Sequence, residues 1–180
     1  MNVEIMSNIF CSVFMGSITI GSVYYMVKDL KKSIDRDYKF LMEFDKEGFN
    51  SSELPLIKIK IFDKYRYFLV DSGANDNVLC YNTISKYPEF ENLKVLNKIK
   101  SFVGANADES DECKLVSTDI TINKDKFNDE VFQLVNLSGV IDAVREECGI
   151  EFIGILGTNF FEKARWMLDF EEKVIWVKKK

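Results

Sequence analysis

The pattern of apolar and polar positions divides the chain into an uncharged N-terminal run and a longer part that predicts mainly strands. No charged residue occurs in the 19 positions 9–27, IFCSVFMGSITIGSVYYMV. As a helix this run is roughly 28 Å long, enough to cross the hydrocarbon core of a bilayer. Tyr24 and Tyr25 stand near its end, where aromatic side chains meet the membrane interface. We expect a transmembrane helix; a cleaved signal peptide, which normally has a basic residue before its apolar run, and a buried helix are the alternatives.

The basic residues around this run predict the side of the membrane on which the remainder lies. None precedes the run, and the residues that follow include Lys28, Lys31, Lys32, Arg36 and Lys39. Positive charge is retained on the cytoplasmic side. We therefore expect a membrane anchor at 1–28, a juxtamembrane linker at 29–53, and a domain at 54–180 that lies in the cytoplasm.

From Leu54 onward the pattern predicts a mostly β domain. LPLIKIKIF alternates apolar residues with lysine, and YRYFLV returns after a turn at Asp63-Lys64. Further strands are expected at 77–81, 98–104, 113–122, 127–136, 165–170 and 174–178, and helical pieces at 82–87, 137–147 and 159–163. The second of these helical pieces is followed by Gly149, which suits a C-cap. Many short strands with few helices are typical of a closed barrel or a sandwich. Before this domain, residues 38–44 fit either a strand or the end of a helix, and residues 48–52 predict a loop.

Composition excludes several classes of function. The net charge is −5 and no basic stripe with interleaved aromatic residues occurs, which argues against nucleic-acid binding. Histidine is absent, so Ser–His and Cys–His catalysis are excluded and the commonest zinc ligand is missing. The four cysteines, at positions 11, 80, 113 and 148, form no CxxC pair. We expect reduced thiols and no metal or cofactor.

One stretch, YFLVDSGANDNVL at residues 67–79, places a carboxylate, a hydroxyl and a glycine at the end of an apolar strand. Asp71-Ser72-Gly73-Ala74, followed by Val78-Leu79, resembles the active-site loop of the retropepsin-like (retroviral-type) aspartic proteases. A second element of that family, two apolar residues and a glycine before a short helix, stands at Ile155-Leu156-Gly157. An aspartate at a strand end is also a common turn residue or helix cap. The order of both elements favours the resemblance, which covers residues 54–178.

The resemblance implies a closed β-barrel subunit with one or two short helices and an active site of Asp71, Ser72 and Gly73. Two carboxylates that share one proton can activate a water for amide hydrolysis, because like charges so close cannot both ionise. The chain contains a single Asp-[Ser/Thr]-Gly, so the resemblance implies a homodimer with one Asp71 from each copy. Anchoring both copies in one membrane raises their local concentration.

The resemblance also implies where a peptide or protein substrate binds. The expected substrate-binding residues follow the active-site loop, belong to a glycine-tipped candidate flap, or precede the second glycine: Ala74, Asn75, Asp76, Val103, Gly104, Ala105 and Ile155. In retroviral members the terminal strands form much of the dimer interface, so KVIWV, residues 173–177, is expected there.

Two positions depart from the family pattern. Retroviral members usually have an acidic residue after the alanine and an arginine after the second glycine, where this chain has Asn75 and Thr158. Both replacements are neutral, so a hydrogen bond is expected in place of an ion pair. The alternative to a protease is a catalytically silent retropepsin-like module that binds peptides or dimerises.

Overall fold

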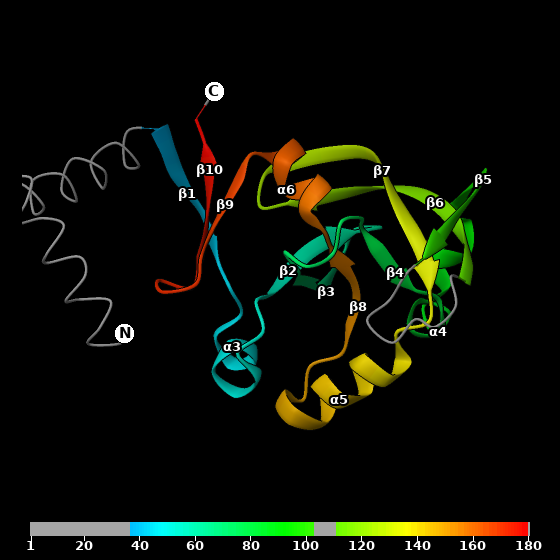
Figure 1. Cartoon of the computed structure of the whole chain (residues 1–180), viewed down its shortest axis with the longest axis horizontal. Helices are drawn as coiled ribbons and strands as arrows, with labels where there is room; N and C mark the ends of the chain where they lie inside the picture. The colour runs from blue at the N-terminus through cyan, green and yellow to red at the C-terminus, as the bar shows by residue number, and fades with distance from the viewer. Residues whose placement is uncertain (1–36, 103–110, 180) are drawn as a thin grey trace, which may run out of the picture. The chain divides into compact units, whose positions relative to one another are not determined.

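The computed structural model describes residues 37–102 and 111–179 and shows a mostly β domain (Figure 1). Its strands are β1 (Tyr38–Glu43), β2 (Leu56–Ile61), β3 (Lys64–Val70), β4 (Val78–Cys80), β5 (Lys94–Phe102), β6 (Asp111–Ile122), β7 (Asp125–Val135), β8 (Phe152–Leu156), β9 (Trp166–Asp169) and β10 (Val174–Lys178). Its helices are α3 (Lys46–Ser52), α4 (Tyr81–Ile84), the 3-10 helix η1 (Pro88–Asn92), α5 (Ser138–Cys148) and α6 (Thr158–Ala164). One compact unit extends over Phe40–Val177.

Six strands close into a barrel. Their hydrogen-bonded order is β2-β3-β8-β4-β7-β6, and β6 returns to pair with β2 at Lys60–Thr121 and Ile61–Ile120. Two pairings, β3 with β8 and β4 with β7, are parallel. β5 pairs with β6 and ends the sheet. The mostly β, closed-barrel class predicted from the sequence is therefore confirmed, with more helical segments than the one or two expected.

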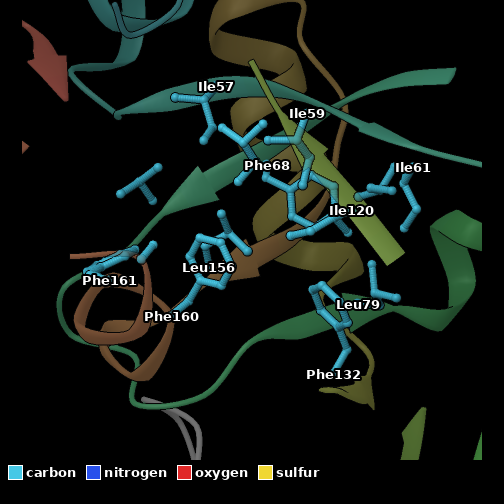
Figure 2. Packing of buried hydrophobic residues seen from close by; sticks show 14 of the residues in the cluster. Ile57, Ile59, Ile61, Phe68, Leu79, Ile120, Phe132, Leu156, Phe160 and Phe161 are labelled. Carbon is cyan, nitrogen blue, oxygen red and sulfur yellow. The ribbon is translucent and has the colours of Figure 1, made fainter. Parts of the chain in front are cut away.

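The alternation of side chains along the strands builds the barrel core. In β2, Ile57, Ile59 and Ile61 are buried, whereas Lys58 between them is exposed. Figure 2 shows side chains from several strands and from α6 converging in one cluster, among them Ile57, Ile59, Phe68, Ile120, Phe132, Leu156 and Phe160. Each such side chain stabilises the fold by about 1.5–3 kcal/mol through its burial.

A second, three-stranded sheet has the order β1-β10-β9. Its first strand settles the open question at 38–44, because Leu41 is buried in the core as part of a strand. β9 and β10 are antiparallel, with Leu168 opposite Ile175 and Met167 opposite Trp176. β10 has a neighbour on both sides. The terminal segment expected at a dimer interface therefore has both strand edges occupied within its own chain.

Helix α3 forms where a loop was predicted. Asp45 caps it by accepting a hydrogen bond from the Gly48 N–H (3.0 Å), and the helix ends at Glu53 in a left-handed conformation. The glycine allows close packing, since a Cβ at position 48 would lie 2.9 Å from a methyl carbon of Leu56 and 3.0 Å from one of Ile150. Residues 48–52, which were predicted to form a loop, therefore belong to a short capped helix.

Helix α5 ends at Gly149 with a φ of 73°, as the sequence predicted for a glycine C-cap. Ile141 and Val144 face a second apolar cluster that includes Leu56 and Phe152. The helix covers one side of the strands that lead to the Asp71 loop.

The predicted membrane span, 9–27, and the start of the linker lie outside the described residues. Over 37–102 and 111–179, no helix is long and apolar enough to cross a bilayer. The proposed division at residues 28 and 53 stays a prediction.

Gly154 in β8 provides a test of the barrel packing. A Cβ there would lie 2.2 Å from the carbonyl oxygen of Val78, and main chain cannot move away as a side chain can. We expect Gly154→Ala to lower the free energy of unfolding by about 1–3 kcal/mol or more, measured by urea denaturation. Gly139→Ala in α5 is the control, because no atom lies within 4 Å of its added carbon. Equal stability of the two variants would contradict this packing.

Candidate active site

The Asp71 loop begins where two parallel strands end. β3 and β8 run in register, with Val70 beside Leu156. The N–H of Asp71 donates a hydrogen bond to the carbonyl oxygen of Leu156 (3.0 Å), which continues the ladder one residue beyond β3. The buried barrel strands therefore fix the main chain of Asp71.

The loop then turns back on its own carboxylate. Asp71 Oδ1 accepts a hydrogen bond from the N–H of Gly73 (2.8 Å), and the carbonyl of Asp71 accepts one from Ala74 (3.3 Å). Asp71 is half-buried, whereas Ser72 and Gly73 are exposed. Among the residues that the structure describes, the second carboxylate oxygen of Asp71 has no hydrogen-bond partner. One oxygen is anchored and the other is available for chemistry.

Gly157 lets the second family element approach this loop closely. A Cβ at this position would lie 2.6 Å from the carbonyl oxygen of Asp76 and 2.8 Å from that of Ala74. No side chain fits in that space. The glycine of Ile-Leu-Gly is thus explained by its contact with the main chain of the Asp71 loop.

The first residues of α6 hold the loop through hydrogen bonds. The N–H of Thr158 donates to the Ala74 carbonyl (2.8 Å), and the Thr158 hydroxyl donates to the same oxygen (3.2 Å). The N–H of Asn159 donates to the carbonyl of Asn75 (3.1 Å). We expected Asn75 and Thr158 to hydrogen-bond to each other. Thr158 instead bonds to the main chain of Ala74, and Asn75 accepts a bond from Asn159 through its own main chain. N–H groups that the start of a helix leaves unpaired find partners there.

Asn77 is a structural residue of the site that sequence reasoning missed. Its side-chain oxygen accepts the N–H of Gly157 (3.1 Å), and its amide nitrogen donates to the carbonyl of Val131 (3.4 Å). Its own carbonyl accepts from Gln133 (2.9 Å). The side chain is 8% exposed. The sequence feature that could have indicated a structural role for Asn77 is its position as a polar residue immediately before the buried pair Val78-Leu79.

Asp76 joins the loop to β7 and α6. Its carboxylate accepts hydrogen bonds from Gln133 Nε2 (2.9 Å) and from Asn159 Nδ2 (3.1 Å). Gln133 Oε1 in turn accepts one from the thiol of Cys113 (3.5 Å). These groups adjoin a cavity of about 260 Å³, whose lining includes Asp76, Gln133 and Asn159. The predicted substrate-binding residue therefore also stabilises the loop.

The same cavity is bordered by a partly buried ion pair. Glu130 of β7 is 5% exposed, and its carboxylate pairs with the ammonium group of Lys163 from α6. Burial of a carboxylate requires such a partner. This pair is a second attachment of α6 to the barrel.

The remaining predicted residues divide into two groups. Ile155 is half-buried in β8, lies opposite Val78, and packs against the two smaller apolar clusters. Val103, Gly104 and Ala105 of the candidate flap lie outside the described residues. The structure therefore places Ala74, Asn75 and Asp76 against Gly157 and bonds Asp71 to Leu156, while Ser72 and Gly73 are exposed in the loop between them.

Comparison with known proteins gives similarity in structure and none in sequence. No protein-family model matches the chain, and no curated protein matches it. The chain is similar in structure to a retropepsin-like aspartic protease. That protein, from Rickettsia conorii, is known from a crystal structure; it shares 15% sequence identity, and the TM-score is 0.49 over 78% of this chain and 89% of the other.

Asn77→Ala tests the clamp between the two loops. The change leaves the buried Gly157 N–H without its partner, which costs about 1–3 kcal/mol of stability for an unpaired buried group. Asn75→Ala is the matched control, because Asn75 is exposed and contributes its main-chain carbonyl. Thermal unfolding should separate the two variants, and equal melting temperatures would show that the Asn77 side chain does not hold the loops.

Proposed function

We propose that the protein is an aspartic endopeptidase that acts as a homodimer, with the water activated between two Asp71 carboxylates. The observation that carries the proposal is the state of the Asp71 carboxylate. One oxygen is fixed by the Gly73 N–H, and the other has no partner among the described residues. Two carboxylates that share one proton need this arrangement in each subunit of the homodimer: one oxygen held in place and the other free to share the proton.

The chemistry follows from what the chain contains. The chain has no histidine, so a carboxylate must act as the base that deprotonates the water. A second, protonated carboxyl group must then donate to the oxyanion that develops on the substrate. One chain supplies one such aspartate, so the counterpart comes from a second copy. Ser72 is exposed beside Asp71, in a position to bind across the axis between copies.

We also propose that the enzyme is anchored in a membrane through residues 9–27, with the domain on the cytoplasmic side. The support is the uncharged run and the basic residues that follow it. Anchoring favours dimerisation, since it confines both copies to two dimensions.

The anchor is tested by fractionation. The full-length chain should sediment with membranes and resist extraction by carbonate or high salt, because its attachment is apolar. A chain from which residues 1–28 are deleted should appear in the soluble fraction. Carbonate extraction of the intact chain would contradict a transmembrane anchor.

The mechanism is tested by Asp71→Asn. Asparagine has nearly the same shape but cannot act as a base or carry the shared proton, so cleavage of a peptide library should fall on the order of 10³-fold or more. Wild-type activity should follow a bell-shaped pH profile, with two apparent pKa values that belong to the pair. Activity per mole should also fall on dilution in detergent, because a monomer holds half of the site.

The control is Asp125→Asn, the same chemical change at an exposed residue of β7. It should keep wild-type activity. Mixing the wild type with an excess of the Asp71→Asn variant should suppress activity through inactive heterodimers. Full activity of the Asp71→Asn variant would overturn the mechanism, and an inert but well-folded wild-type dimer would favour the silent binding module.

A further inference from the structure

The sheet edges of the domain differ in how they are protected. Within residues 37–102 and 111–179, an edge without a neighbouring strand occurs at β1, β5 and β9. An open edge invites pairing with another chain, and proteins usually block it with charged side chains. β5 has Lys94 exposed at its start, and β1 has Glu43 exposed at its end. β9 has the sequence WMLD, with three apolar residues in a row.

The position of β9 couples it to the candidate active site. It begins two residues after α6 ends, and α6 donates the hydrogen bonds that hold the Asp71 loop. Trp166 of β9 packs edge-to-face on Phe160 (5.2 Å between ring centroids) and stacks on Phe161 (5.9 Å). Figure 1 shows β9 directly after α6 and beside β10. A partner bound at β9 is therefore connected to the loop through one short helix.

We infer that β9 is the strand through which a second copy of this chain docks, pairing antiparallel with β9 of the partner subunit. This inference rests on the proposed function, which requires a second Asp71. β10 cannot take this role through its edges, because β1 and β9 occupy both. The result is a continuous sheet, β1-β10-β9, followed by the same three strands of the partner in reverse order.

Charge at the ends of β9 favours this arrangement. A two-fold axis at Met167 places Arg165 opposite Asp169 of the partner subunit, and the reverse pair forms at the other end. Arg165 is exposed and Asp169 half-exposed. Phe170, the next residue, is 49% exposed and adds apolar surface beside the pairing. A stable interface needs about 800 Å² from each copy, so this surrounding surface contributes along with the strand itself.

The test uses full-length chains in detergent, labelled with donor and acceptor fluorophores to measure self-association. Met167 faces away from the core, because its neighbours Trp166 and Leu168 pack inward. Met167→Lys and Met167→Glu should each raise the dissociation constant of the dimer ~100-fold, since like charges then face each other across the axis. Mixing the two variants should restore association and, because both carry Asp71, cleavage as well.

The matched control is Phe40→Lys, which places the same charge on the outer face of the same sheet at a residue that is 53% exposed. It should leave the dissociation constant unchanged. Retained wild-type affinity in the Met167→Lys variant, failure of the mixture to associate, or a monomeric wild type would overturn the inference. A wild type that dimerises through β9 and is inactive on every peptide would refute the proposed function and leave the interface in place.

Discussion

The close contact between Gly157 and the Asp71 loop is the constraint on which the candidate site depends. Two main chains meet where a Cβ would lie 2.6 Å from a carbonyl oxygen. Three groups in this contact are paired: the carbonyls of Ala74 and Asn75 accept hydrogen bonds, and the Gly157 N–H donates one to the Asn77 side chain. The N-terminal end of α6 is stabilised by the same bonds that fix the loop, so neither can shift alone.

The barrel explains why these two segments meet. β3 and β8 are parallel neighbours, so their carboxyl ends lie at the same edge of the sheet, and the residues that follow each strand are adjacent. β4 then crosses β8 in the antiparallel direction at Gly154, which returns the chain after the loop to the barrel. A parallel pair requires a long connection between its strands. The long segment between β3 and β8 thus separates the two elements in sequence while the sheet brings them together.

The sequence predicted what depends on local pattern. Most strands, the glycine end of α5, and the two loop elements at Asp71 and Gly157 were expected, whereas β8 was not predicted and β1 was left open between a strand and a helix. The role of Asn77 was not expected, because a polar residue before a strand carries no sign that it will bind a loop 80 positions away. The turn between β2 and β3 was placed one residue late, since Phe62 adopts a left-handed φ of 47° that bulky residues rarely adopt. Its ring packs edge-to-face on Phe90, 5.2 Å away between centroids, and this distant contact supplies a reason for the conformation.

The neutral replacements at Asn75 and Thr158 change how the site responds to acid. A carboxylate–arginine clamp weakens when the carboxylate is protonated, whereas the hydrogen bonds from Thr158 and Asn159 to main-chain carbonyls contain no titrating group. Elsewhere, burial acts to raise the pKa of Glu151, but hydrogen bonds from Lys86, Tyr87 and Arg145 together hold that pKa below its usual value. A lowered folded-state pKa adds stability above the unfolded pKa, and this stability is lost as the pH falls through the folded value. The contacts of Glu151 with Arg145 of α5 and with Lys86 therefore persist at a pH below the usual pKa of a glutamate.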